Sequence, residues 1–572
     1  MKLSEFLVKY LFDKGVTHVF ELSGGMIANF LEAFYEFKKI EVISMHHEQG
    51  VSFAVDGFSR IANFPAIGLA TSGPGAINLL TGIGSCYFDS VPAIFITGQV
   101  NMHENKGERL IRQLGFQETD IVSMVKPICK AVYKLESAGQ FPQIIEEAFN
   151  IALSGRPGPV LIDIPMNLQG HDVSIENAIT CVENVDSNNK LDISLWDKLN
   201  DKISKSIKPL ILAGRGVNTS NSRDLLVQFA EKTNIPIVTS ILGLDVIHYD
   251  HPLRAGFIGT YGNRWANTLL GECDLLIVLG SRLDIRQTGA DVNFFASRDI
   301  IHIDIDSHEI NNRVKNCFPI VADIHSFLTM AVVKIETMNI SDRGLWFERF
   351  IELKEKYPDL AEIATSGIHP NSFLHTLSKA SQKVGAYIAD VGNHQMWCAQ
   401  SLEINKGQYF LTSGGMGAMG YSLPASIGAC FALNKPVISI SGDGGFQLNI
   451  QELQTIVRNN LPVKIVVLNN KSLGMIRQFQ ECYFNSHYQS SIWGYSCPDF
   501  EQIANAYTIK SKTIKSSDEI DEGIKAMWEN PEEPFLLQVM LDPFLNCYPK
   551  IAFGKPLTEM EPLSQPIELE GT

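Results

Sequence analysis

The chain has 572 residues, enough for about three or four domains. Its 47 Lys and Arg against 63 Asp and Glu give a formal net charge of −16, which makes the chain a poor candidate for binding nucleic acid or an anionic membrane surface, since both favour basic patches. Hydrophobic residues at 45% and charged residues at 19% are typical of a large soluble enzyme and exclude global disorder.

The cysteines and the first residues indicate a cytoplasmic protein. Ten cysteines are scattered without a CxxC pair, so we expect reduced thiols, with neither a disulfide framework nor a zinc site. Lys9, Asp13 and Lys14 interrupt the apolar residues at the start, which therefore lacks the apolar core of a signal peptide. No stretch approaches the ~18–20 apolar residues of a transmembrane helix.

Short apolar, β-branched runs recur along the chain, each ending in Gly, Asp or Ser before a helical pattern. This alternation predicts an α/β fold of three doubly wound parallel sheets covered by helices on both faces, with ligands at the carboxyl ends of the strands. The predicted strands are residues 41–45, 66–71, 93–97, 160–164, 209–213, 235–239, 275–279, 300–305, 386–389, 437–440, 463–468 and 535–540.

Two polar stretches, 171–190 and 336–344, are interpreted as linkers. They divide the chain into blocks at 1–170, 190–335 and 360–545, followed by a tail at 546–572. The tail is rich in Pro and Glu, and we expect it to lie over the surface or to extend as a lid.

Blocks one and three contain similar glycine-rich turns, each between a predicted strand and a helix. One is residues 71–78 (TSGPGAIN) and the other is residues 441–449 (SGDGGFQLN). These segments alone leave open whether the two blocks are related or the turns arose independently.

The most specific motif is Gly442-Asp443-Gly444, followed after 24 residues by Asn469-Asn470. Glycines after a strand permit a tight turn and leave a helix N-terminus open to a diphosphate. Asp443 and the amide oxygen of Asn470 would supply oxygen ligands, which together with diphosphate oxygens suit Mg²⁺. The alternative is an ordinary turn with an unrelated Asn pair. The whole pattern resembles the thiamine diphosphate (ThDP) motif.

Two further segments can be assigned a role in cofactor binding once that motif is recognised. Glu48 follows the predicted strand 41–45 and by itself would be interpreted as a helix cap. Beside the ThDP motif it resembles the glutamate that hydrogen-bonds N1′ of the cofactor's aminopyrimidine. That hydrogen bond assists proton removal at C2 of the cofactor. Met419, in SGGMGAMG, matches the apolar residue that wedges the cofactor into a V shape, although such a Met is also ordinary core filler.

The resemblance extends over roughly residues 1–550. The chain is similar to the acetohydroxyacid (acetolactate) synthase large subunit in segments 72–76, 115–118, 155–165, 391–397 and 469–475. This similarity implies a pyrimidine-binding domain at 1–170, a central FAD- or nucleotide-binding domain at 190–335 and a diphosphate- and Mg²⁺-binding domain at 360–545. It also implies ThDP held between two chains, with Glu48 from one subunit and Asp443 from its partner. Whether the protein is a dimer or a tetramer, and whether it has a regulatory subunit, stays open.

The resemblance assigns roles residue by residue. Glu48, Gln117 and Met419 would be catalytic, and Asp443, Asn470 and Ser472 would hold the metal. ThDP would further contact Gly73, Asn78, Val391, Gly392, Asn393, His394, Gly417, Gly442, Gly444, Gly445, Gly474 and Met475. A structural FAD would contact Gly214, Arg215, Gly216, Arg282, Asp284, Arg286, Asp304 and Asp323, unless the central domain has kept its fold and lost the flavin.

Several departures from the family cluster at the expected acceptor pocket. Met166 replaces a Lys, Phe257 a Met, Ile258 a His, Phe479 a Trp and Asn393 a Gln, whereas Arg109, Gln117, Lys130 and Arg286 are retained. Arg286, Phe479, Phe257, Ile258 and Lys130 are the predicted substrate residues. The replacements predict an acceptor other than pyruvate or 2-ketobutyrate; drift within a plain synthase is the alternative.

Three functions are compared. The first is a carboligase that decarboxylates pyruvate and transfers the two-carbon unit to a 2-oxoacid or another carbonyl acceptor, including a keto sugar nucleotide. The second is a simple 2-oxoacid decarboxylase, but the adjacent His46-His47 pair lies beside Glu48, which is the synthase pattern. The third is a non-catalytic binding protein, disfavoured because Glu48, Asp443, Asn470 and Met419 are all present.

Overall fold

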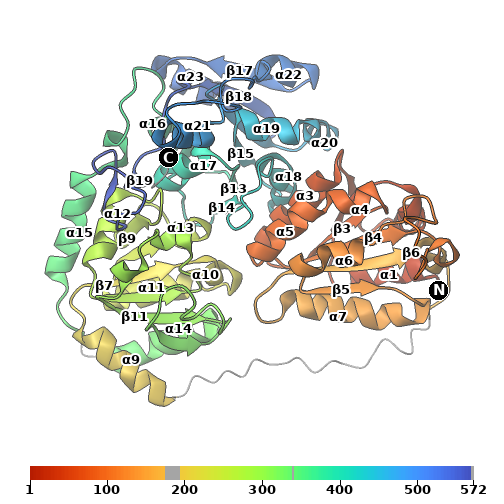
Figure 1. Cartoon of the computed structure of the whole chain (residues 1–572), viewed down its shortest axis with the longest axis horizontal. Helices are drawn as coiled ribbons and strands as arrows, with labels where there is room; N and C mark the ends of the chain where they lie inside the picture. Colours follow the sequence, from red (N-terminus) through yellow and green to blue (C-terminus); the bar gives the residue numbers. More distant parts are fainter. Residues whose placement is uncertain (174–192, 338–339, 568–572) are drawn as a thin grey trace.

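The computed structural model describes residues 1–173, 193–337 and 340–567, which form three α/β blocks and a tail (Figure 1). Most of the first predicted linker (174–190), residues 338–339 of the second and residues 568–572 of the tail lie outside the described residues.

The first block contains six parallel strands in the order β2-β1-β3-β4-β6-β5. Its strands are β1 (His18–Leu22), β2 (Glu41–Ser44), β3 (Ala66–Ala70), β4 (Ala93–Gln99), β5 (Ala131–Lys134) and β6 (Pro159–Pro165), and its helices are α1 (Leu3–Asp13), α2 (Ala28–Phe37), α3 (Glu48–Ala62), α4 (Pro74–Asn78), α5 (Leu80–Phe88), α6 (Ile121–Val125), α7 (Phe141–Leu153) and α8 (Met166–Gln169).

The central block contains a parallel sheet in the order β12-β11-β10-β7-β8-β9, which is the doubly wound order of dinucleotide-binding sheets. Its strands are β7 (Pro209–Ala213), β8 (Ile237–Thr239), β9 (Arg254–Phe257), β10 (Leu275–Leu279), β11 (Asp299–Asp304) and β12 (Phe318–Val321), and its helices are α9 (Ile193–Lys205), α10 (Arg215–Thr219), α11 (Arg223–Thr233), α12 (Arg264–Glu272), α13 (Ile285–Thr288), α14 (Ile324–Lys334) and α15 (Gly344–Lys356).

The third block contains a parallel sheet in the order β14-β13-β15-β16-β18-β17. Its strands are β13 (Ala386–Ala389), β14 (Tyr409–Thr412), β15 (Val437–Gly442), β16 (Val463–Asn469), β17 (Lys510–Ile514) and β18 (Phe535–Met540), and its helices are α16 (Pro370–Ala380), α17 (Asn393–Ser401), α18 (Ser422–Leu433), α19 (Asp443–Leu448), α20 (Leu453–Arg458), α21 (Gly474–Tyr483), α22 (Phe500–Ala506) and α23 (Ile520–Met527).

The first and third sheets have the same order when the strands of each block are numbered from one, namely 2-1-3-4-6-5. The two glycine-rich turns occupy the same position in this order, since one follows β3 and the other follows β15, the third strand of its block. The similarity between the turns is therefore part of a shared architecture.

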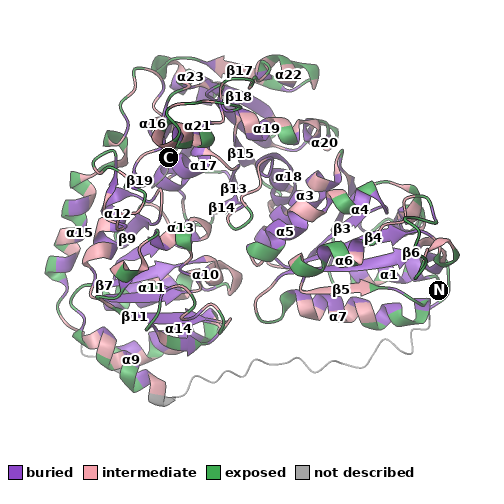
Figure 2. Cartoon of the chain, viewed as in Figure 1, coloured by how far each residue is buried: buried purple, intermediate pink, exposed green. Residues whose placement is uncertain are grey.

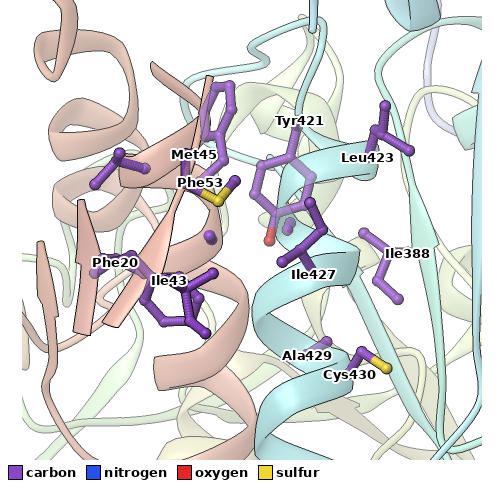
Figure 3. Packing of buried hydrophobic residues seen from close by; sticks show 14 of the residues in the cluster. Phe20, Ile43, Met45, Phe53, Ile388, Tyr421, Leu423, Ile427, Ala429 and Cys430 are labelled. Carbon is purple, nitrogen blue, oxygen red and sulfur yellow. The ribbon is translucent and has the colours of Figure 1, made fainter. Parts of the chain in front are cut away.

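Helices α3 and α18 join these two blocks at a close crossing. A Cβ on Gly57 would lie 2.1 Å from the carbonyl oxygen of Ala425, and a Cβ on Gly428 would lie 1.9 Å from that of Ala54. Figure 3 shows apolar side chains of block one facing those of α18, among them Phe53, whose ring meets Tyr421 edge to face at a centroid distance of 5.4 Å. The two blocks therefore share one apolar core.

The tail packs against the central block. Its strands β19 (Lys550–Ile551) and β20 (Met560–Glu561) form a small antiparallel sheet, and the backbone N–H of Ile551 donates to Thr260. Arg264 donates to the carbonyls of Met560 and Glu561, and Met560 is fully buried. The described tail is thus partly core, as the burial colours show (Figure 2), and extends less than expected from its composition.

The predicted α/β class is confirmed, and every predicted strand is present to within about two residues. The sequence prediction missed β1, β5, β9, β12, β14 and β17 of the three large sheets, of which all but β1 lie at sheet edges, and the short tail strands β19 and β20. In the described part of the chain, no helix is both long and apolar enough to cross a membrane.

Candidate active site

The carboxyl edge of the third sheet brings Asp443 beside Asn470. Strands β15 and β16 run parallel with Gly442 opposite Leu468, so the turns after both strands open on the same side. Burial raises the pKa of the Asp443 carboxyl to about 6, which hydrogen bonds from Tyr495 (2.7 Å) and the backbone N–H of Asn470 partly oppose. A divalent cation at this edge would hold the carboxylate ionised.

Buried polar side chains gather at the N-termini of α17 and α21. Asn393, at the start of α17, is 4% exposed, and neither its amide nitrogen nor its amide oxygen has a hydrogen-bond partner in the described part of the protein. A Cβ on Gly474 would lie 2.7 Å from the amide nitrogens of both Asn393 and Asn470. A buried unpaired amide is costly, so this site is built for an external polar group.

His394 completes this edge as a neutral imidazole. Burial lowers its pKa to about 3, and its Nε2 accepts the backbone N–H of Gly442 at 3.3 Å. The neighbouring residues adopt the backbone that the turn needs, since Gly392 has φ of +156° and the N–H of Val391 donates to Asp390.

The remaining residues predicted for this half-site surround the same turns. Ser472 donates its N–H to Asn470 Oδ1, and a Cβ on Gly445 would lie 2.6 Å from Asp390. Met475 receives the hydroxyl of Tyr261 at its sulfur, 3.0 Å away.

Met419 lies in the loop 413–420 that connects β14 to α18. A Cβ on Gly444 would lie 3.4 Å from the Met419 methyl, so the side chain reaches over the glycine-rich turn. Gly417 has φ of +65° and Gly420 of +81°, which a side chain would strain. The loop thus holds Met419 next to the glycine-rich turn that carries Asp443.

The carboxyl edge of the first sheet gathers Glu48, Gly73, Asn78 and Gln117. Glu48 begins α3 and is 8% exposed, and its Oε2 accepts the side-chain amide of Asn78 at 2.9 Å. Gly73 has φ of +65°, and a Cβ there would lie 2.9 Å from the Gln117 side chain. The second oxygen of Glu48 can accept a hydrogen bond from a ligand.

Hydrogen bonds join the two blocks close to the predicted catalytic groups. Asn449 donates to Gln49 Oε1 at 3.0 Å, and the N–H of His46 donates to Glu452 at 3.1 Å. Among the described residues, no hydrogen bond or ion pair joins Glu48 to Met419 or Asp443.

A cavity of about 610 Å³ lies where the central block meets the other two. Every residue predicted to contact FAD lines it except Gly214, which packs directly against Gly280 in its wall. Its cationic groups are Arg156, Arg215, Arg282 and Arg286, and burial of Arg215 lowers the pKa of its guanidinium to about 10. Burial raises the pKa of Asp304 to about 6.

The predicted substrate residues divide into two groups. Phe257, Ile258 and Arg286 line the 610 Å³ cavity, whereas Phe479, 48% exposed, packs its ring at a tilt against Tyr483 on α21. Lys130 is already occupied, because its Nζ donates to the carbonyls of Ile151 and Ser154 at the end of α7, each at 2.5 Å. Arg109 lies in an exposed segment and Met166 starts α8.

Sequence reasoning assigned no site role to Asp89 and Arg156. Arg156 lines the cavity, where it donates to Ser90 and Glu309, and its signal was the motif at 155–165. Asp89 hydrogen-bonds the Met419 loop from another block, and nothing in its local sequence indicates that contact.

The residues present fit Mg²⁺ and ThDP. No group of three or more His, Cys, Asp or Glu able to hold a metal occurs within residues 1–173, 193–337 and 340–567. The fit to Mg²⁺ rests on the Asp443 carboxylate and the Asn470 amide, which lie after neighbouring strands and offer the oxygen ligands that Mg²⁺ takes together with substrate phosphates.

Comparison with known proteins agrees with this chemistry. Residues 1–124, 196–331 and 390–539 match the N-terminal TPP binding domain, the central domain and the C-terminal TPP binding domain of thiamine pyrophosphate enzymes. The chain is 37% identical to a probable acetolactate synthase large subunit of Methanocaldococcus jannaschii, over 100% of this chain and 96% of that protein. It is 35% identical to the acetolactate synthase large subunit of Lactococcus lactis (97% and 95%) and 34% identical to the isozyme 2 large subunit of Escherichia coli (98% and 99%).

With three matching domains in order and similarity along almost the whole length, the chain belongs to the acetolactate synthase large-subunit family of thiamine pyrophosphate enzymes.

Proposed function

We propose that this protein decarboxylates pyruvate and joins the two-carbon unit to a second carbonyl compound. The observation that carries the proposal is the buried, unpaired amide of Asn393 beside Asp443 and Asn470, in a chain whose relatives are acetolactate synthases. In this proposal residues 1–170 bind the pyrimidine, 190–335 the flavin and 360–545 the diphosphate.

Each group has a defined task. Asp443, Asn470 and Ser472 hold Mg²⁺ and, through it, the diphosphate, which Asn393 and the N-terminus of α21 also bind. Glu48 would hold a proton at N1′ of the pyrimidine, and Met419, which lies over the glycine-rich turn, would support the bound cofactor. When bound, thiamine diphosphate supplies a thiazolium that accepts the electrons released on decarboxylation.

The site is proposed to form between two subunits. Glu48 and Asp443 are not joined within one chain, and apolar side chains close to each half-site are exposed, including Ile77 and Phe116 in block one and Met416 and Leu448 in block three. A second copy would cover these side chains and bring the half-sites together.

Mixing two inactive variants tests this arrangement. The two kinds of subunit, Glu48→Gln and Asp443→Ala, are refolded or co-expressed together. Each mixed dimer should then have up to about half the activity of a wild-type dimer, because one of its two sites is intact. No recovery in dimers shown to be mixed would place both residues of a site in one chain.

FAD is proposed to fill the 610 Å³ cavity. The cavity combines the doubly wound strand order with Arg215, Arg282 and Arg286, which can pair a dinucleotide diphosphate. Because carboligation needs no net redox change, the flavin would be structural. Flavin absorbance in the purified protein, released on denaturation, tests this, and a colourless protein that takes up no added FAD would refute it.

The acceptor is proposed to be larger than pyruvate. Phe479, Phe257, Ile258 and Met166 take the positions of a Trp, a Met, a His and a Lys, which removes cationic or donor groups and adds apolar surface. Arg286 favours a carboxylate acceptor instead, so plain acetolactate synthesis is the second candidate.

The kcat/KM for pyruvate homocoupling decides between them. We expect slow homocoupling by the wild type, faster pyruvate consumption with a bulky carbonyl acceptor such as a keto sugar nucleotide, and a 10–200-fold change in preference in Phe479→Trp. Efficient homocoupling by the wild type that Phe479→Trp leaves unchanged would establish the plain synthase. Aldehyde as the sole product would establish a simple decarboxylase.

A further inference from the structure

The loop that bears Met419 is held at both ends by carboxylates. At its start, Asp89 accepts the backbone N–H groups of Gly414 (2.9 Å) and Gly415 (2.7 Å). At its end, Asp390 accepts those of Gly420 and Ser422, both at 2.9 Å. Between these two pairs of hydrogen bonds, which we call clamps, the loop is partly exposed to solvent, since Met416 is exposed. The two carboxylates therefore fix where Met419 lies.

The two clamps belong to different blocks. Asp390 follows β13 in the same block as the loop, whereas Asp89 follows α5 in block one. Asp89 is held by Arg60 at 2.7 Å, and Arg60 also binds Asp56, which accepts the hydroxyl of Tyr421 at 2.5 Å. All these side chains are buried, so the network ties the loop rigidly to α3.

The first clamp also forms part of the central cavity. Asp89, Gly414 and Gly415 all line the 610 Å³ space, together with Phe88 and Ser90. A ligand in the cavity would cover these two hydrogen bonds and exclude water from them, which strengthens charge-assisted hydrogen bonds.

We propose that Asp89 is a positioning residue for Met419, and that a flavin dinucleotide in the central cavity promotes ThDP activation by closing over the Asp89 clamp. This inference rests on the proposed function. It assigns the flavin a mechanical task that needs no electron transfer, with Asp89 as the link between the two cofactor sites.

Asp89→Asn tests the inference, with the exposed Asp521→Asn on α23 as matched control. The Asn side chain has one acceptor oxygen, whereas the Asp89 carboxylate has two, so only one oxygen remains for the backbone N–H groups of Gly414 and Gly415. We expect Asp89→Asn to bind ThDP and Mg²⁺ within about 3-fold of wild type by calorimetry, because no diphosphate contact is lost. Its hydrogen–deuterium exchange at C2 of bound ThDP should fall by on the order of 10–100-fold, as expected for a misplaced group.

Amide exchange measures the link to the cavity directly. In the wild type, adding FAD to flavin-free protein should slow backbone amide exchange in peptides covering 411–421, and in Asp89→Asn this slowing should disappear. Unchanged C2 exchange in a folded Asp89→Asn, or equal FAD effects in both proteins, would overturn the inference.

Two further outcomes are decisive. If Asp89→Asn does not fold, the wild-type experiment alone decides, since no effect of FAD on residues 411–421 contradicts the inference. If the wild type binds no ThDP, the proposed function fails as well, whereas normal wild-type binding with an unaffected Asp89→Asn removes only the role of Asp89.

Discussion

The sheets of the first and third blocks run in the same strand order and carry a glycine-rich turn after the same strand, but their polar edges differ. In the third block the turn itself contains an acid, Asp443, with Asn470 after the next strand. In the first block the turn 71–78 contains no acid, and the buried carboxylate, Glu48, follows a different strand, β2. One architecture thus yields two different polar edges, to which the proposed function assigns the metal diphosphate and the pyrimidine proton.

The interiors of the two sheets also differ in charge. In block one, Asp163 on β6 accepts from Thr97 (2.7 Å) and Gln99 (3.0 Å) on β4. At the corresponding strand pair of block three, Gln538 on β18 accepts from Asn469 on β16 at 3.1 Å. The same cross-strand bridge is therefore ionisable in one sheet and neutral in the other.

The largest expected effect is the loss of activity on changing Asp443, at the polar edge of the third sheet. Asp443→Ala should abolish activity through loss of Mg²⁺ and of diphosphate anchoring, and excess metal should not restore it. Calorimetry with ThDP and Mg²⁺ measures the loss, with Asp521→Ala as the surface control. Tight ThDP binding by Asp443→Ala would show that the third block does not hold the diphosphate through this residue.

A smaller loss is expected at the first edge. Glu48→Gln keeps the size of the side chain and should leave ThDP binding largely intact, but should slow C2 exchange by about 10²-fold or more, because proton assistance at N1′ is lost. The comparison fails if Glu48→Gln loses cofactor affinity as severely as Asp443→Ala.

The crossing of α3 and α18 gives a third test. Gly57→Ala and Gly428→Ala each place a Cβ against a backbone carbonyl of the other helix, and each should lower the free energy of unfolding by about 1–3 kcal/mol. Gly139→Ala, where a Cβ meets nothing within 4 Å, is the control. Since the two glycines lie at the same helix crossing, we expect the double variant to be non-additive in denaturant unfolding.

The fourth test concerns pH. Burial raises the pKa of Asp163 to about 6, so folding favours the protonated carboxyl relative to the unfolded chain. Its contribution to stability is full below about pH 4 and is lost as the pH rises towards 6. Relative to Asp163→Asn, the wild type should lose about 3 kcal/mol at most over this interval and remain level above it. A difference between the two that does not vary from pH 4 to 7 would contradict this, and Gln538→Glu should create a similar dependence in the third sheet.

The residues predicted from the sequence are those whose chemistry depends on local pattern. Buried central strands such as β10 and β16 are continuous apolar runs that only a doubly covered sheet accommodates, and their bounds were predicted to within one residue. Edge strands such as β17 (KSKTI) and β12, which contains Pro319, were missed because one side faces solvent and the apolar signal is weak.

The sequence by itself determined the α/β class, the family and the residues at the ends of buried strands, because spacing along one strand–turn–helix unit decides where Asp443, Asn470 and Glu48 lie. Tertiary structure alone decided that Asp89 reaches Gly414 across 325 residues, that Lys130 is occupied by carbonyls of α7, and that three blocks enclose one cavity. Such contacts depend on how separate sheets and helices pack, and residues far apart in the chain carry no shared local pattern that would reveal them.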